Sequence, residues 1–304
     1  MNTKMNAKTR VLSIAQAAYD PAIVCINDQA LESIEFPKDG LTAMHSEILQ
    51  LPAGETAQSA AEYLLILNSL NFRFWDVVEG NFTRYDYKGL VGALGMRKAF
   101  AEAWGPQRWS SNFWRNLYKH GVLGLFGNIP AVEDRAIILD ELYGLVRCGK
   151  FYSITSRIAL VAAQMRKFTM EDAEAIAQAC PLSYGDSYLK KAQLMLAEYA
   201  SFYSEVVAPV DCTDFTLFAD YQLPRVMRAL GLLTYSDALS TKIAQQELVA
   251  VDSPEEQAIR AATILAGERL AKRLQCTTAQ LDNYLWLNRK KAEGNFHLTP
   301  TTNY

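Results

Sequence analysis

The sequence predicts a mainly α-helical protein that forms a single domain over residues 1–304, and three observations support this prediction. Apolar residues recur at spacings of three and four through most of the chain, which is the period of a helix with one buried face. Residues that cap helix N-termini precede several of these stretches. Runs of β-branched residues alternating with polar ones are scarce, and Asp39-Gly40 is the only hairpin-type dipeptide that we identify.

The first strongly periodic segment covers residues 61–75 (AEYLLILNSLNFRFW). Its buried face is expected to contain residues spaced four, three and four positions apart, namely Tyr63, Leu67, Leu70 and Phe74. Ser59 and Glu62 stand three residues apart ahead of this face and match a capping box. We therefore expect a helix that begins at Ser59 and extends to about Phe74.

Three later segments carry similar signals. In residues 188–203 the apolar stripe consists of Ala192, Met195, Leu196, Tyr199, Phe202 and Tyr203. Residues 253–256 (SPEE) supply an N-cap, a proline at the first helical position and an acid that returns to the cap. The buried face that follows contains Ile259, Thr263, Ala266 and Leu270. Thr277 and Gln280 cap a last helix over residues 281–291.

A cluster of glycine and proline at residues 124–130 predicts a joint between two helical lobes within the single domain. The cluster is too short to indicate two separate domains. We find no repeat of fixed period and no low-complexity linker.

The composition excludes several functional classes. The formal net charge of −3 argues against a protein that binds DNA or RNA through many phosphate contacts, but it permits a small phosphorylated ligand. The five cysteines are widely spaced and odd in number, which favours free thiols in a reducing compartment. The three histidines lack zinc-ligand spacing, so we expect no protein-built metal site and no cofactor.

The chain also lacks the signals of secretion and of membrane insertion. Its polar, basic start is not a signal peptide, and no apolar run approaches the roughly 18 residues of a membrane span. We expect a cytoplasmic protein without a membrane partner. Phosphate-binding GxxxxGK[ST] loops, GxSxG elbows and HExxH helices are all missing.

Residues 218–224 (FADYQLP) contain the strongest candidate for chemistry, Asp220. The local sequence favours a helix N-cap, since aspartate is preferred just ahead of a helical run. A carboxylate between two aromatic residues is also compatible with a partly dry pocket, where its unscreened charge stabilises a neighbouring cation. Local sequence leaves both interpretations open.

Blocks in the same order along most of the chain resemble the queuosine salvage protein family. LNSLNFRFW (residues 67–75) is similar to the family's LNFxFW stretch, and Lys190-Lys191-Ala192-Gln193 to its basic-basic-Ala-Gln helix. Residues 218–239 resemble its most distinctive block. The helix carrying Glu256, Ile259, Arg260 and Glu268, and the closing LDNYLW at residues 281–286, follow the family's spacing. Residues 95–180 match poorly.

The resemblance implies a helical fold related to helix-hairpin-helix DNA glycosylases. It also implies an enzyme that hydrolyses queuosine 5′-monophosphate to ribose 5-phosphate and queuine, the latter for salvage into tRNA modification. The family's catalytic carboxylate maps onto Asp220 and its base-contacting aromatic residue onto Phe218. His45 falls where the family carries a histidine in its ligand pocket.

Further site residues follow from the chemistry of that substrate. Queuine carries an ammonium and guanine-like N–H donors, which favour carboxylate partners, and Asp282 is our candidate; a solvated acid in the first turn of a helix is its alternative. The phosphate needs cations, for which Lys190 is the candidate, although paired lysines usually mark a solvated helix face. Tyr221, Tyr235 and Trp286 are candidates for aromatic walls, with the core as their alternative.

Arg73, Gln222, Arg225 and Leu287 depart from the family pattern and keep other functions open. One is an N-glycosidase acting on a different modified or ordinary nucleoside 5′-monophosphate. Another is a noncatalytic protein that binds a nucleoside or nucleobase. A DNA-repair glycosylase is disfavoured by the acidic net charge and by the lack of a recognisable hairpin GxG motif.

Overall fold

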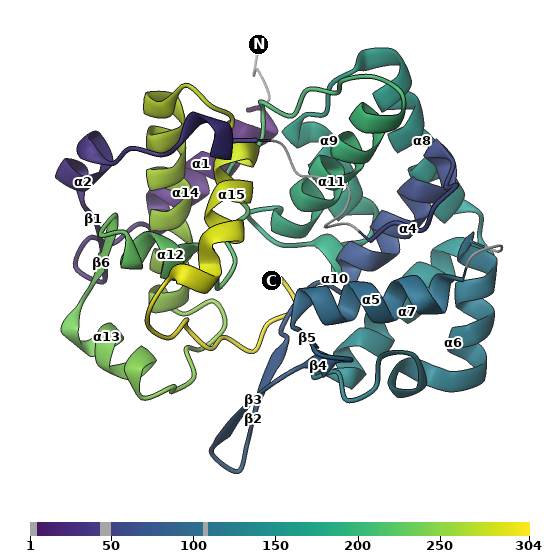
Figure 1. Ribbon diagram of the computed structural model, residues 1–304, viewed down its shortest axis with the longest axis horizontal. Helices are drawn as coiled ribbons and strands as arrows, with labels where there is room; N and C mark the ends of the chain where they lie inside the picture. Colours follow the sequence, from purple (N-terminus) through teal and green to yellow (C-terminus); the bar gives the residue numbers. More distant parts are fainter. Residues whose placement is uncertain (1–4, 43–49, 106–108) are drawn as a thin grey trace.

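A computed structural model describes residues 5–42, 50–105 and 109–304, and it confirms the mainly α-helical fold (Figure 1). The helices are α1 (Ala7–Ala18), α2 (Asp28–Ser33), α4 (Ala57–Ser69), α5 (Ala93–Trp104), α6 (Trp109–Phe126), α7 (Val132–Arg147), α8 (Lys150–Met165), α9 (Met170–Ala179), α10 (Pro181–Tyr184), α11 (Lys190–Val206), α12 (Leu223–Ala229), α13 (Asp237–Ala244), α14 (Pro254–Leu274), α15 (Thr278–Leu287) and the 3₁₀ helices η1 (Lys38–Gly40) and η2 (Asn288–Lys291). Within these described ranges no helix is both long and apolar enough to cross a membrane.

The strands form small antiparallel pairs that the sequence analysis did not predict. They are β1 (Val24–Ile26) with β6 (Leu233–Tyr235), β2 (Trp75–Val78) with β3 (Asn81–Arg84), and β4 (Asp86–Tyr87) with β5 (Leu90–Val91). Two of these pairs are hairpins that turn at Glu79-Gly80 and Lys88-Gly89, where all four residues have positive φ. The hairpin-type dipeptide Asp39-Gly40 lies in the 3₁₀ helix η1.

Figure 1 shows two lobes that face one another. One contains α4 to α11 with the two hairpins, and the other contains α2, α12 to α15 and the β1–β6 pair. Helix α1 packs against both α14 and α9, so it contacts both lobes. The glycine- and proline-rich residues 124–130 connect α6 to α7. Phe126 at the end of α6 and Ile138 in α7 belong to one hydrophobic cluster, so this connection lies within the larger lobe. The single domain over the whole chain stays a prediction.

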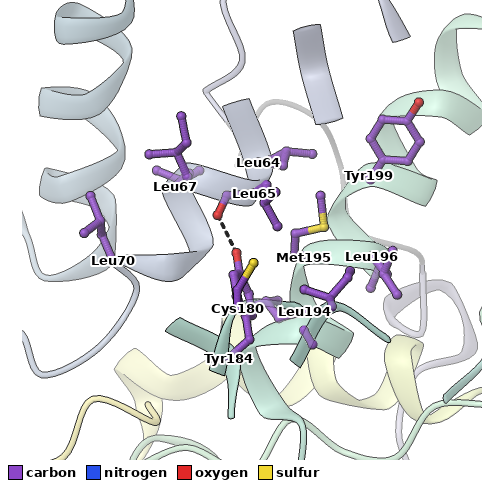
Figure 2. Close-up of a cluster of buried hydrophobic side chains, with 14 of the residues drawn as sticks. Leu64, Leu65, Leu67, Leu70, Cys180, Tyr184, Leu194, Met195, Leu196 and Tyr199 are labelled. Atoms are coloured by element: carbon purple, nitrogen blue, oxygen red, sulfur yellow. Dashed lines mark hydrogen bonds between the residues drawn. The ribbon is translucent and has the colours of Figure 1, made fainter. Parts of the chain in front are cut away.

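Two helices at the centre of the larger lobe are buried on every side. Figure 2 shows Leu64, Leu65 and Leu67 of α4 packed near Met195 and Tyr199 of α11. The hydroxyl of Tyr184 donates a hydrogen bond to the backbone carbonyl of Leu65 in the same cluster (Figure 2). The stripe predicted for α11 is confirmed, since all six of its residues are buried. The α14 stripe is also entirely buried.

The predicted limits of α4 were wrong at both ends. Its N-cap is Thr56, which exchanges hydrogen bonds with Ser59 in a capping box, so the helix begins at Ala57. Glu62 is buried and accepts a hydrogen bond from Ser110 Oγ at 2.7 Å instead of capping. The helix ends at Ser69, and Phe74 is buried beyond it.

The N-cap residues predicted for the last two helices are confirmed. Ser253 Oγ accepts a hydrogen bond from the Glu256 backbone N–H, and Pro254 occupies the first helical position of α14. Thr277 and Gln280 form a reciprocal capping box at α15. The Glu256 side chain does not return to the cap, because its Oε1 accepts a hydrogen bond from the Tyr304 hydroxyl at 2.9 Å.

Residues 292–304 run from η2 back toward the larger lobe, in yellow in Figure 1. The Arg73 backbone N–H donates to the Tyr304 carbonyl at 3.1 Å, and Val249 N–H donates to the Leu298 carbonyl at 2.8 Å. This segment is therefore attached to both lobes, and it brings Phe296 and Tyr304 to the cavity described below.

Candidate active site

Residues from both lobes line a cavity of about 450 Å³. The larger lobe contributes the end of β3, the segment from Gly89 to Leu94, Arg97 and the inner face of α11. The other lobe contributes the segment from Phe218 to Arg225, together with α15, η2 and the returning segment 292–304. The site consists of segments distant in sequence, which only the fold brings together.

Asp220 lines this cavity from the irregular segment between α11 and α12, and 9% of its surface is exposed. Its Oδ1 accepts hydrogen bonds from the backbone N–H groups of Gln222 at 2.7 Å and Leu223 at 2.9 Å, at the start of α12. The N-cap of α12 is Gln222, so the N-cap interpretation of Asp220 was wrong, although its carboxylate accepts hydrogen bonds from the residues that start this helix. Hydrogen bonds from the helix start fix the orientation of a carboxylate that borders the cavity.

Helix α11 holds the segment that carries Asp220 through Gln193. The Gln193 amide Oε1 accepts a hydrogen bond from the Thr216 backbone N–H at 2.8 Å, and its Nε2 donates to the Thr216 hydroxyl at 3.1 Å. Both groups are fully buried. The glutamine of the KKAQ block therefore positions a chain segment four residues before Asp220.

A buried arginine holds the same segment from α14. Arg260 Nε donates to the backbone carbonyl of Ala219 at 3.3 Å, and its two Nη groups bind both oxygens of Asp186, at 2.8 and 2.6 Å. Asp186 Oδ2 also accepts a hydrogen bond from the Lys190 backbone N–H at 3.0 Å, at the start of α11. This bidentate pair connects α14, α11 and the peptide next to Asp220.

At Gly267, which has no Cβ atom, the Leu217 side chain packs directly against the backbone of α14. A Cβ atom added there would stand 2.1 Å from Leu217 Cδ1, which is far inside van der Waals contact. Leu217 directly precedes Phe218, so this contact sets how deeply the site segment packs. Asp282 of α15 fixes the next peptide, since its Oδ2 accepts a hydrogen bond from the Phe218 backbone N–H at 2.9 Å.

Lys190 is buried among carboxylates. Burial lowers the pKa of its ammonium, and the negative charges of Asp220, Asp282 and Glu198 oppose this shift. Burial raises the pKa of Asp282 well above its usual range; the Phe218 hydrogen bond and Lys190 oppose the rise, and Asp220 adds to it. Two carboxyl groups and one ammonium therefore form an electrostatically coupled group at the cavity wall.

The solvated-face alternative for the two lysines is contradicted, because 4% of Lys190 and 2% of Lys191 is exposed. Lys190 lines the cavity, whereas Lys191 donates to the Ser69 carbonyl at 3.0 Å, and its Nζ lies 4.9 Å from the centre of the Phe72 ring. The solvated alternative for Asp282 is contradicted as well, since only 4% of it is exposed.

The aromatic candidates separate into two groups. Phe218, Tyr221 and Trp286 line the cavity, and the Tyr221 ring centre lies 4.6 Å from that of Phe296. Tyr235 does not border the cavity; it is buried in β6 within the core of the smaller lobe. His45 lies outside the described residues.

Several residues that line the cavity were not predicted. Arg97 and Glu198 form a buried ion pair, and Glu198 Oε2 also accepts a hydrogen bond from Asn68 Nδ2 at 2.7 Å. Arg84 reaches the cavity from β3, and Arg289 and Lys290 reach it from η2. A charged residue within an apolar stripe, such as Glu198 in α11, is the one sequence signal that could have identified part of this set.

The described residues contain no group of three His, Cys, Asp or Glu side chains placed to bind a metal ion. The charged residues of the cavity instead form two groups. Lys190 interacts electrostatically with Glu198 and Asp282, and Arg84, Arg225 and Arg289 interact with one another. Asp220 interacts electrostatically with members of both groups. A ligand that carries a cation at one end and an anion at the other would match this distribution.

Comparisons with known proteins agree with the resemblance noted in the sequence. The model of the family described as "Queuosine salvage protein" matches residues 51–304. A Sphaerobacter thermophilus protein named queuosine 5′-phosphate N-glycosylase/hydrolase is 31% identical over 247 residues, covering 75% of this chain and 73% of its own. Proteins of the same name are 27% identical over 240 residues in Nematostella vectensis (73% and 68% covered) and 24% over 264 residues in Mus musculus (75% and 76%).

Proposed function

The chain belongs to the queuosine salvage protein family, and from this premise we propose that it hydrolyses the N-glycosidic bond of queuosine 5′-phosphate, releasing queuine and ribose 5-phosphate. One observation carries the proposal for the reacting centre. Asp220 is a largely buried carboxylate, held by two backbone N–H groups at the edge of a cavity large enough for a small ligand.

In our proposal Asp220 acts at C1′ of the ribose. Breaking the C1′–N bond leaves the electron pair on the base and builds positive charge on the sugar. A carboxylate already fixed beside C1′ stabilises this charge without reorganising during the reaction. Water then supplies the oxygen that bonds to C1′, and its proton balances the negative charge left on the base. Covalent attack by Asp220 and purely electrostatic stabilisation both fit this geometry.

The chemistry of queuine limits how an enzyme can stabilise it as a leaving group. Queuine is a 7-deazapurine, so a carbon replaces the N7 that an acid would protonate in guanine. We infer that the enzyme stabilises the leaving base elsewhere, through its ammonium and its N–H donors. Asp282, which lines the cavity near Lys190, is our candidate carboxylate for this role.

Phe218, Tyr221 and Trp286 complete the proposed base site as apolar walls. We retain His45 as a candidate contact to the base or its cyclopentenediol, on the basis of the resemblance alone. The substrate is a free nucleotide, and we propose a cytoplasmic protein with neither nucleic acid nor membrane as a partner.

The test is to incubate the purified protein with queuosine 5′-phosphate and to detect free queuine by mass spectrometry. Guanosine 5′-phosphate, incubated in parallel, tests the identity of the base. Faster release of guanine than of queuine would replace the proposed substrate by an ordinary nucleotide. Recovery of bound queuosine 5′-phosphate intact after prolonged incubation would instead establish a noncatalytic binding protein.

A further inference from the structure

Helix α14 carries a buried carboxylate, Glu256, that the proposed reaction does not use. Glu256 does not line the cavity, and 2% of its surface is exposed. Its Oε1 accepts a hydrogen bond from the Tyr304 hydroxyl at 2.9 Å and lies 3.7 Å from Arg260 Nη1. A buried carboxylate is unfavourable unless other groups compensate its charge. The contacts of Tyr304 and Arg260 therefore show what Glu256 does in the fold.

The Tyr304 hydroxyl lies between Glu256 and His297. The hydroxyl oxygen is 3.1 Å from His297 Nε2, and 1% of this histidine is exposed. Burial lowers the pKa of His297 to about 3, and the charge of Arg260 adds to the shift, so the imidazole is neutral at physiological pH. An ionised Glu256 can only accept, so the hydroxyl donates to Glu256 and accepts from the Nε2–H of His297. These two hydrogen bonds hold the Tyr304 side chain in one position.

The Tyr304 ring packs against the guanidinium of Arg260. The ring centres of Tyr304 and Tyr188 lie 4.7 and 4.6 Å from Arg260 Cζ. Arg260 Nε donates a hydrogen bond, at 3.3 Å, to the carbonyl of the peptide that joins Ala219 to Asp220. The orientation of this guanidinium therefore affects the backbone that carries Asp220.

Tyr304 also connects Arg260 to the larger lobe. Its backbone carbonyl accepts a hydrogen bond from the Arg73 N–H at 3.1 Å, and Tyr304 lines the cavity. One residue therefore contacts the backbone of the larger lobe, a carboxylate of α14 and the arginine that holds the Asp220 peptide.

We propose that Tyr304 is a positioning residue for the Asp220 carboxylate. This inference rests on the proposed function. The hydroxyl, held by Glu256 and His297, keeps the Tyr304 ring against Arg260, and Arg260 holds the peptide of Asp220. Positioning of this kind matters for the rate, because a displacement of about 1 Å at a reacting centre can cost on the order of 10²-fold.

The first experiment compares Tyr304→Phe with Tyr199→Phe, its matched control. The Tyr199 hydroxyl donates to the Ala57 carbonyl at 3.0 Å, and Tyr199 is buried without lining the cavity. Both variants keep a ring and lose a buried hydroxyl, so both should melt at a lower temperature than the wild type. Only Tyr304→Phe should lower kcat for queuine release from queuosine 5′-phosphate, by roughly tenfold, because only this variant should displace Asp220.

Calorimetry with queuine distinguishes positioning from direct contact with the ligand. The dissociation constant of queuine should change little in Tyr304→Phe, because the proposed effect acts through Arg260. A weaker affinity with unchanged kcat would make the Tyr304 hydroxyl a ligand contact and overturn the proposal. Equal kcat values in Tyr304→Phe and Tyr199→Phe would overturn it as well.

Two variants of Glu256 test the hydrogen bond itself. The amide oxygen of Glu256→Gln can still accept from the Tyr304 hydroxyl, whereas Glu256→Leu removes the acceptor. We therefore expect Glu256→Leu to lower kcat about as much as Tyr304→Phe does, and Glu256→Gln to lower it less. Equal losses in the two Glu256 variants would mean that the hydrogen bond to Tyr304 does not set the rate, which would contradict the proposal.

Combining Tyr304→Phe with Asp220→Asn tests whether the effect passes through Asp220. If it does, Tyr304→Phe should cost little further rate once the carboxylate has been replaced, because residues that act as a unit are not additive. Single-turnover release of queuine measures the rates. Additive losses would place the effect of Tyr304 elsewhere and overturn its assignment as a positioning residue for Asp220.

Hydrogen exchange separates this inference from the proposed reaction. The backbone N–H groups of Gln222 and Leu223 donate to Asp220 Oδ1. Their exchange, followed by mass spectrometry, should be roughly tenfold faster in Tyr304→Phe than in Tyr199→Phe. Faster exchange in a protein that releases no queuine would refute the reaction and keep the positioning role. Queuine release by the wild type, with exchange and kcat unchanged in Tyr304→Phe, would refute the positioning role alone.

Discussion

The carboxylate of Asp220 lies just ahead of α12, whose N-cap is Gln222. It accepts two backbone hydrogen bonds at the start of α12, and it borders the cavity. These hydrogen bonds hold the charge in one orientation, which is what electrostatic catalysis requires. The proposed catalysis therefore depends on these two backbone hydrogen bonds.

Asp220→Asn should fold normally, because the amide oxygen can accept the same hydrogen bonds from Gln222 and Leu223. Loss of the negative charge beside C1′ should lower kcat by roughly 10²- to 10³-fold or more. Single-turnover release of queuine measures this effect. Asp214→Asn is the control, since Asp214 accepts a backbone hydrogen bond from Met170 outside the cavity. Turnover near that of the control would remove Asp220 from the reaction.

Asp282 predicts a dependence of stability on pH. Its pKa is raised in the folded protein, first by burial. Protonation therefore favours the folded state, and this contribution is complete below the unfolded pKa of about 3.9 and is lost as pH rises through the folded value. Asp282→Asn mimics the protonated form at every pH and can still accept the Phe218 N–H.

The melting temperature of Asp282→Asn, relative to wild type, should accordingly rise as the pH is increased from about 4, the unfolded pKa, toward neutrality. Thermal unfolding followed by circular dichroism at several pH values measures this difference. A difference that stays constant over the range would mean that Asp282 is ionised in the folded protein throughout.

At the scale of the elements, α14 positions the site through a small residue as much as through Arg260. Gly267→Ala would place a Cβ 2.1 Å from Leu217 Cδ1 and should destabilise the fold by about 1–3 kcal/mol, as overpacking does. Because Leu217 leads into Phe218, kcat should fall as well. Urea unfolding and turnover measure the two effects.

Gly144 in α7 provides the matched substitution, since nothing lies within 4 Å of an added Cβ there. Gly144→Ala should stabilise the protein by roughly 0.5–1 kcal/mol through helix propensity and leave turnover unchanged. If Gly267→Ala behaves like Gly144→Ala, the packing of Leu217 does not restrict the site segment.

At the scale of the whole molecule, the cavity belongs to neither lobe alone. Arg97 and the segment from Gly89 to Leu94 form one wall, and Asp282, Trp286 and η2 form another. The segment 292–304 is attached to both lobes through Val249 and Arg73. A ligand in the cavity would therefore contact, and stabilise, both lobes.

Binding of the product queuine should slow amide hydrogen exchange in residues 89–97 and also in residues 282–290. Exchange in α8, which does not line the cavity, serves as the internal reference. Hydrogen exchange with mass spectrometry resolves these segments. Protection confined to one lobe would contradict a site built from both.

The sequence allowed the helical fold, the caps of α14 and α15 and the buried stripe of α11 to be predicted, because these depend on residues a few positions apart. It failed for the strands, which are two to four residues long and too short to show alternation. It also misplaced both ends of α4, because a helix buried on all sides has no solvated face to define its period.

For the candidate site, the sequence indicated Asp220, Phe218, Tyr221, Lys190, Asp282 and Trp286, and all of them line one cavity. It did not indicate Arg84, Arg97 or Arg289, whose surroundings come from distant segments. Tyr235 was predicted to line the cavity, but it belongs to the hydrophobic core of the smaller lobe.

By itself, then, the sequence determined the helical character, the N-caps of α14 and α15, and the family to which this chain belongs. These features depend on residues that are neighbours in the chain and on motifs that occur in a fixed order along it. The tertiary structure alone decided which charges face one another. Lys190 interacts with the carboxylates of Asp220 and Asp282, and Arg289 with Arg84 and Arg225, although these residues belong to segments that are distant in the sequence. Electrostatic interactions act through space, so only the folded chain decides which charges meet.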